Sequence, residues 1–107
     1  MFQERSEIRS RIPADELLAG LAEEASELAQ AALKLRRAYT QVNPTPITEE
    51  EGYDRLLEEI ADVEIYLGLL PLNKVVIEDL KEHKIERWLV RLKGAKDERK
   101  ASPESGK

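Results

Sequence analysis

The chain has 107 residues, of which 41% are apolar and 36% are charged, and its formal net charge is −5. This length predicts a single domain, and this composition is typical of amphipathic helices with solvated outer faces. The negative charge argues against a protein that binds long nucleic acid, although it leaves room for a local basic patch. Because there is no cysteine and only one histidine, His83, disulfides, thiolate metal sites and the usual zinc sites are excluded.

Neither a membrane span nor a secretory signal is expected. The sequence has no apolar run approaching the roughly 20 residues that a membrane helix needs. Residues 1–5 lack the apolar core of a signal peptide. We therefore expect a cytoplasmic protein that does not engage a membrane.

The first long helix is predicted from residue 13 to about residue 39, after a charged segment, 2–12, that suits a short helix or arm. Pro13 fits the first helical turn, and Asp15 and Glu16 then lie near the positive end of the helix dipole. Apolar residues recur at spacings of three and four, which is the period of an amphipathic helix. These residues are Leu17, Leu18, Leu21, Ala25, Leu28, Ala32 and Leu35.

A loop and a second helix follow. Pro44 and Pro46 interrupt the helical pattern, because proline has no backbone N–H and restricts the residue before it. Thr48 and Glu51 have the spacing of a capping box, which predicts that a second helix starts here. That helix should run to about Leu70, where the next proline stops it.

The third long helix is predicted from residue 74 to about residue 93, with Asn73 as its cap and Gly94 as its stop. The charged residues 95–107, rich in Ser, Pro and Gly at their end, are expected to form a disordered tail. The predicted domain therefore covers residues 1–94.

Three long amphipathic helices predict an all-α fold, arranged as an antiparallel helical bundle. One chain of this size cannot hide all of its apolar helix faces. We therefore expect a homodimer or homotetramer in which pairing of copies completes the core.

Two pairs of carboxylates lie beside the apolar faces of the first two long helices. Glu24 and Glu27 are i,i+3 neighbours on one helix, and Glu59 and Asp62 have the same spacing on the next. If these helices pair with those faces inward, four carboxylates meet, and an all-oxygen ligand set favours Mg²⁺ or Mn²⁺. Glutamate is common on helix surfaces, which is sufficient to explain either pair alone. Both pairs together, in apolar and small-residue surroundings, favour a metal site.

Two further acids are candidate catalytic residues. Glu23 and Glu58 each precede a predicted ligand, and either can orient or deprotonate an attacking water. Both positions point further from the apolar stripe, so an ordinary solvated surface role is the alternative.

Substrate contacts are predicted near the two carboxylate pairs. Lys34 lies two turns after Glu27 on the same helix face, which suits phosphate binding; a favourable charge at the helix end is the alternative. Tyr66 lies one turn after Asp62, where its ring can stack on a nucleobase or belong to the core.

The third helix carries a basic stripe at i, i+3 and i+7. Its residues are Lys84, Arg87 and Arg91, of which the first two are candidate phosphate ligands. Salt bridges to neighbouring glutamates explain the same residues equally well.

The pattern E-E-x-x-E at 23–27, followed by E-x-x-D at 59–62, resembles the MazG-type all-α nucleoside triphosphate pyrophosphohydrolases. The segment LEEIADV at 57–63 is similar to the second motif of that family. The loop NPTP at 43–46 resembles that of small members from bacteria and their phages. The likeness extends over about 17–92.

This resemblance implies that Glu24, Glu27, Glu59 and Asp62 coordinate Mg²⁺, and that water splits a nucleotide into its monophosphate and pyrophosphate. It also implies a helical dimer or tetramer with sites between helices. The basic residues that follow the second motif in the family are matched only loosely by Lys84 and Arg87.

Two other functions are compatible with the sequence. One is a non-catalytic helical interaction module that retains the metal without turnover. The other is a regulator that binds nucleotide or DNA through the basic stripe at 84–91. Mg²⁺-dependent release of pyrophosphate distinguishes the enzyme from both.

Overall fold

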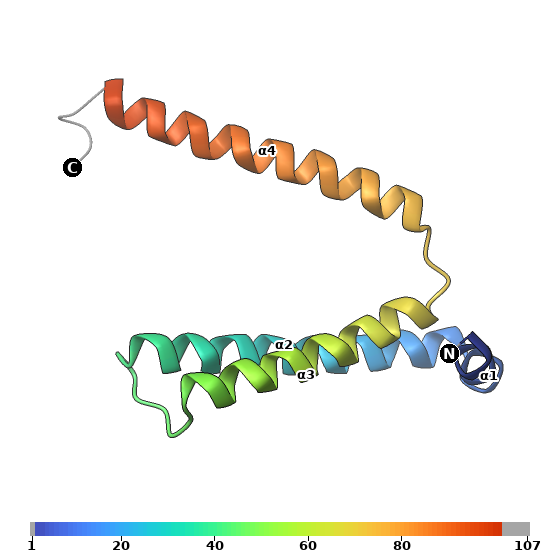
Figure 1. Cartoon of the computed structure of the whole chain (residues 1–107). Helices are drawn as coiled ribbons and strands as arrows, with labels where there is room; N and C mark the ends of the chain where they lie inside the picture. Colours follow the sequence, from blue (N-terminus) through green and yellow to red (C-terminus); the bar gives the residue numbers. More distant parts are fainter. Residues whose placement is uncertain (1, 102–107) are drawn as a thin grey trace. The chain divides into compact units, whose positions relative to one another are not determined.

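The computed structural model describes the backbone of residues 2–101 and the side chains of residues 3–95. This part of the chain is helical and contains no strand, which confirms the all-α prediction (Figure 1). Its helices are α1 (Phe2–Arg11), α2 (Ala14–Thr40), α3 (Glu49–Leu69) and α4 (Lys74–Ala101).

Helix α2 begins and ends close to the predicted positions. Pro13 precedes it in an extended conformation, and Asp15 and Glu16 occupy its first turn. At the other end Gln41 adopts the left-handed conformation with φ of 53°, and its backbone N–H donates to the carbonyl oxygen of Arg37 over 2.8 Å. This is the geometry in which helices commonly end, because it satisfies a carbonyl group that the last turn leaves free.

Helix α3 starts with the predicted capping box. The hydroxyl oxygen of Thr48 accepts a hydrogen bond from the backbone N–H of Glu51 over 3.0 Å. The Glu51 carboxylate accepts one in return from the backbone N–H of Thr48 over 2.8 Å. Two N–H groups at this end are therefore satisfied by side-chain chemistry that is local in the sequence.

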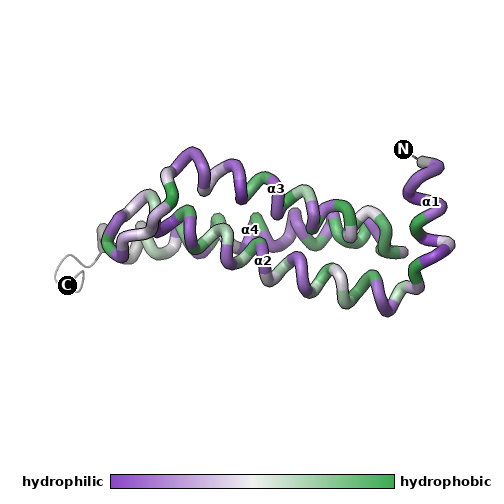
Figure 2. The backbone as a smooth tube through the Cα atoms, turned by 90° about the horizontal axis from the view of Figure 1, so that it is seen from below, coloured by the Kyte–Doolittle hydropathy of each residue, from purple (hydrophilic) through white to green (hydrophobic). Residues whose placement is uncertain are grey.

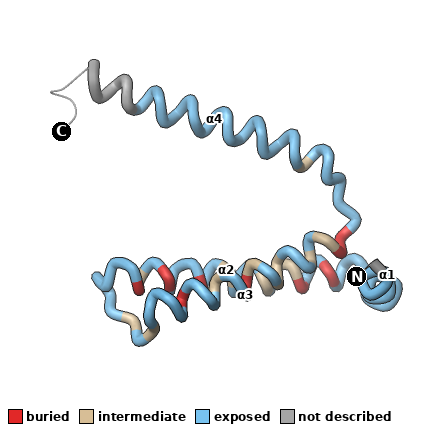
Figure 3. Tube along the Cα trace, in the orientation of Figure 1, coloured by how far each residue is buried: buried red, intermediate tan, exposed pale blue. Residues whose placement is uncertain are grey.

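Helices α2 and α3 lie side by side and run in opposite directions (Figure 1). Apolar and polar positions alternate along α2, turn by turn (Figure 2). Buried positions are spread along both helices of this pair (Figure 3). Leu17, Leu69 and Leu70 form one buried cluster, against which Leu21 and Tyr66 pack. Burial of each such leucine contributes about 1.5–3 kcal/mol, so this face holds the pair together.

Small residues let the other end of the pair close tightly. Ala31 and Ala38 are buried on α2, as is Leu35 between them. Opposite them, a side chain added at Gly52 of α3 would bring its Cβ to 3.1 Å from Cδ1 of Leu35. The glycine therefore allows the first turn of α3 to approach α2 closely.

Helix α1 crosses the end of the pair where α3 finishes (Figures 1 and 2). Arg9 donates from Nη1 to the carbonyl oxygen of Gly68 over 3.3 Å. This bond satisfies one of the carbonyl groups that the last turn of α3 leaves unpaired.

The structure divides the chain after Leu72 into two compact units, and the single domain over 1–94 stays a prediction. The second unit consists of α4, which Asn73 caps by accepting from the backbone N–H of Val76 over 3.1 Å, as predicted. Of the described side chains of α4, only Ile77 is even partly buried, and the rest are exposed (Figure 3). An apolar pattern on a helix predicts that its apolar face is buried. It does not say whether the surface that covers this face belongs to the same unit.

The prediction that Gly94 ends the third long helix is wrong, because α4 continues to Ala101. Glycine in a helix interior costs about 1 kcal/mol relative to alanine, which the helix-forming residues that follow it can offset. The predicted disordered tail, 95–107, therefore begins with helix, and positions 102–107 lie outside the described residues.

No helix in the described part of the chain is both long enough and apolar enough to cross a membrane.

Gly94 offers a direct test of how far α4 extends. A Cβ added at Gly94 meets no atom within 4 Å, so Gly94→Ala should stabilise the helix by about 0.5–1 kcal/mol without a clash. Helical content measured by circular dichroism should stay the same or rise. Gly94→Pro is the opposite control, and it should lower the helical content. A Gly94→Pro protein with unchanged helicity would show that the helix ends before this residue.

Candidate metal centre

Three carboxylates meet between α2 and α3. Glu24 and Glu27 project from α2 and Glu59 from α3, and one oxygen of each lies within 4.8 Å of the others. Glu24 and Glu27 share a face because they are three residues apart, and the opposite run of α3 brings Glu59 beside them. An arrangement of this kind concentrates negative charge from two helices in one place.

Glu59 is the buried member of the group, with 4% of its surface exposed. Its Oε2 lies 3.4 Å from Nε of Arg55, one turn earlier on α3. Its Oε1 has no hydrogen-bond partner in the described part of the chain, and neither does Oε2 of Glu24. A buried polar atom without a hydrogen-bond partner costs folding free energy, so these oxygens are suited to ligating a cation.

The donor set fits a hard divalent cation. All three groups offer carboxylate oxygen and none offers nitrogen or sulfur, which suits Mg²⁺ or Mn²⁺. An acidic cluster alone is common on protein surfaces. Here the burial of Glu59 and its unpaired oxygen are the second, independent sign of a binding site.

The electrostatics of the group act most strongly on Glu24. Its partial removal from water raises the pKa of its carboxyl group above the ordinary value. The negative charges of Glu27, Asp62, Glu59 and Glu23 raise this pKa further, in that order. Without a cation, the ionised form of Glu24 is therefore less favourable in the folded protein than in an exposed glutamate.

Asp62 and the two candidate catalytic acids lie around this group. Asp62 lines a hollow together with Glu24 and Glu23, but it does not belong to the set of oxygens within 4.8 Å. Glu58 is an exposed residue of α3. The structure thus brings three of the four predicted ligands together and puts Asp62 at their edge.

The hollow beside Glu24 has a volume of about 550 Å³, and we call it the Tyr66 hollow. The Tyr66 ring lies directly over Gly20: a Cβ added there would overlap ring carbons and lie 2.7 Å from the hydroxyl oxygen. Glycine at this position therefore makes room for the ring. The large apolar side chains in the lining are Ile8, Ile12, Leu17, Ile65, Tyr66 and Leu69, and Ala19 is also part of it.

A second hollow, of about 260 Å³, lies beside Glu27, and we call it the Lys34 hollow. Lys34 and Arg55 are its basic residues, and Gln30 and Glu51 are also in its lining. Lys34 was predicted from the sequence, whereas Arg55 was missed. The i,i+4 spacing of Arg55 and Glu59 was the available signal, because residues so spaced are neighbours on a helix.

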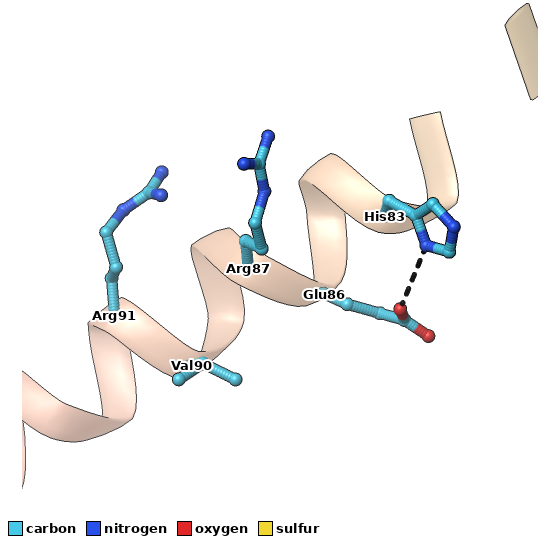
Figure 4. A pocket seen from close by; sticks show the side chains of 5 residues that line it. All are labelled: His83, Glu86, Arg87, Val90 and Arg91. Atoms are coloured by element: carbon cyan, nitrogen blue, oxygen red, sulfur yellow. Dashed lines mark ion pairs between the residues drawn. The ribbon is translucent and has the colours of Figure 1, made fainter. Parts of the chain in front are cut away.

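The predicted phosphate ligands Lys84 and Arg87 are exposed residues of α4, in the second unit. Arg87 and Arg91 line a shallow groove with Val90, made by side chains of this one helix (Figure 4). At its edge Nδ1 of His83 lies 3.7 Å from Oε1 of Glu86, an ion pair when the histidine is protonated. The role of Lys84 and Arg87 at the carboxylates therefore stays a prediction.

No family model, curated protein or solved structure matches this chain.

The crowding of carboxylates around Glu24 predicts that removing its charge stabilises the folded protein. Glu24→Gln should raise the melting temperature of the metal-free protein at neutral pH, because it removes a charge that the folded state disfavours. The gain should shrink as the pH falls through the raised pKa of Glu24, because the wild-type carboxyl group then becomes neutral as well. It should vanish below the ordinary glutamate pKa, where the unfolded chain is also protonated. Thermal unfolding of both proteins across this pH range measures the effect.

Added Mn²⁺ provides the control. A ligand that binds only the folded state stabilises it by about 2.7 kcal/mol at a hundredfold excess over its Kd. Millimolar Mn²⁺ should therefore raise the melting temperature of the wild type more than that of Glu24→Gln, so that the wild type becomes the more stable protein. NaCl of equal ionic strength should not reverse the order in this way. Equal responses of both proteins to Mn²⁺ would contradict the metal site.

Proposed function

We propose that this protein is a Mg²⁺-dependent nucleotide pyrophosphohydrolase, which cleaves nucleoside triphosphates to the monophosphate and pyrophosphate. The observation that supports this most is the group of Glu24, Glu27 and Glu59 with its buried, unpaired oxygens. The resemblance of motifs 23–27 and 59–62 to the MazG-type enzymes supports the same function.

The cation would be held by Glu24, Glu27 and Glu59, with Asp62 at the edge of the group. Bound there, Mg²⁺ would offset the charge of the polyphosphate and make water more acidic. In the reaction, water adds to the α-phosphorus and the bond to the β-phosphate breaks. Glu23 lines the Tyr66 hollow and is the better placed of the two candidate bases to accept the proton from water.

The two hollows suit the two ends of a nucleotide. The volume of the Tyr66 hollow, about 550 Å³, lies within the range of small-molecule sites, and its lining is largely apolar. The Tyr66 ring offers a surface on which a base can stack. Lys34, in the other hollow, is the cation for a phosphate group.

The proposal includes a homodimer or homotetramer in which helices of a second copy complete an antiparallel bundle. Monomeric soluble proteins rarely leave large contiguous apolar patches exposed. The described part of this chain exposes many large apolar side chains on its long helices. Among them are Leu18, Leu33, Leu57, Ile65, Leu67, Leu80, Trp88 and Leu92.

The assembly is tested by light scattering at micromolar concentration. The mass should be two or four times the 12.2 kDa of one chain. A helical monomer that unfolds cooperatively at this concentration would contradict the assembly, while leaving the metal site to its own test.

The enzymatic activity is tested by pyrophosphate release from a panel of nucleotides with and without Mg²⁺. Asp62→Asn keeps the size of the side chain but removes its charge, and it should lower kcat/KM by about a hundredfold or more. The fold should survive, since a repelling carboxylate is lost. Circular dichroism checks this.

Glu64→Gln is the matched control, because Glu64 is an exposed acid of the same helix and its replacement changes the net charge equally. It should keep the wild-type rate. A folded Asp62→Asn protein with full activity would contradict the role of Asp62 in the site. A wild type that releases no pyrophosphate would contradict the hydrolase. A non-catalytic regulatory module would then be the better description.

A further inference from the structure

We propose that Arg55 is a phosphate-binding residue that Glu59 holds in the metal-free protein and gives up when the cation binds. Arg55 then contacts the phosphates of the substrate together with Lys34. This inference rests on the proposed function and adds to it a residue, a direction for the substrate and a coupling between the two ligands.

The first observation is the position of the Arg55–Glu59 pair. Nε of Arg55 lies 3.4 Å from Oε2 of Glu59, and the Arg55 side chain is 64% exposed whereas that of Glu59 is 5% exposed. The guanidinium group therefore reaches from solvent to the buried carboxylate. In the absence of a metal, it is the positive charge that offsets the carboxylate group.

The second observation is that Arg55 and Lys34 line the same hollow. Within residues 3–95, Glu59 is the partner that the structure records for Arg55, and none is recorded for Lys34. Both side chains line the Lys34 hollow, with Glu27 at its edge. Two cations, one of them 64% exposed, thus line the same small space beside the predicted cation site.

The relative strengths of two contacts favour a move of Arg55 from the Glu59 carboxylate to a phosphate group. An ion pair with one exposed partner is weak, because water screens it. A guanidinium group binds phosphate oxygens through two parallel hydrogen bonds, which are among the stronger polar contacts in proteins. Once a divalent cation offsets the charge of Glu59, Arg55 gains more from a phosphate than from the carboxylate.

The same arrangement gives the substrate a direction. Glu24 lines the Tyr66 hollow and Glu27 lines the Lys34 hollow, so the carboxylates lie between the two. A nucleotide with its base against Tyr66 then extends its terminal phosphates toward Lys34 and Arg55. Pyrophosphate, the part released, is therefore the ligand that these two cations should hold.

The test measures two ligands, Mn²⁺ alone and inorganic pyrophosphate in the presence of Mg²⁺. In Arg55→Gln, Mn²⁺ should bind about two- to fivefold more tightly, because an exposed competing charge has been removed. Pyrophosphate should bind at least about fivefold more weakly, because a charge-assisted contact is lost. Electron paramagnetic resonance of free Mn²⁺ and titration calorimetry of pyrophosphate give the two affinities.

Three further variants sharpen the result. Arg55→Lys keeps the charge but loses the paired donors, so it should leave Mn²⁺ affinity near the wild-type value and restore only part of the pyrophosphate affinity. Lys34→Ala should weaken pyrophosphate binding with a smaller effect on Mn²⁺. Arg11→Gln removes an arginine from an exposed i,i+4 pair with Glu7, and it should change neither affinity.

Each alternative outcome has a separate meaning. If Mn²⁺ affinity falls in a folded Arg55→Gln protein, Arg55 only supports Glu59 and the inference is wrong. If pyrophosphate affinity is unchanged, the phosphate contact is wrong, while hydrolysis by the wild type would still support the proposed function. A wild type that neither binds Mn²⁺ nor releases pyrophosphate from nucleotides would overturn both.

Discussion

The feature on which the rest of this structure depends is the crowding of carboxylates between α2 and α3. Two helices that pack through leucine and alanine also bring Glu24, Glu27 and Glu59 together, one of them buried. Like charges at this separation repel, and the partial exclusion of water strengthens the repulsion. The apolar contacts of the helix pair must therefore hold a site that opposes folding in the absence of a cation.

Small residues allow this crowding. Gly20 admits the Tyr66 ring, and Gly52 admits the side chain of Leu35, so the two helices approach closely at two points along their length. Close approach shortens the separation of the carboxylates and also shapes the wall of the Tyr66 hollow. The packing of the two helices and the grouping of the carboxylates thus depend on the same backbone positions.

The position of Arg55 beside Glu59 reduces the repulsion among the carboxylates. An exposed guanidinium group beside Glu59 offsets charge while the cation is absent, and it is weakly enough held to be released. A more deeply buried partner would lose more hydration on folding and would be harder to release from the carboxylate. The exposed pair is therefore compatible with the proposed exchange of Arg55 between Glu59 and a phosphate.

The sequence by itself determined the features that depend on neighbours within one or two helical turns. The capping box of Thr48 and Glu51, the Asn73 cap and the i,i+3 carboxylate pairs are of this kind, since the atoms involved are close whatever the rest of the chain does. The error at Gly94 was also local: the cost of one glycine was overestimated against the residues that follow it.

Only the tertiary structure decided which of these residues meet. The burial of Glu59, the place of Asp62 at the edge of the group and the shared hollow of Lys34 and Arg55 depend on the register between α2 and α3. Packing of side chains far apart in the sequence sets that register. The division of the chain after Leu72 also depends on tertiary contacts. A helical pattern in the sequence identifies an apolar face, but it does not identify the surface that covers this face.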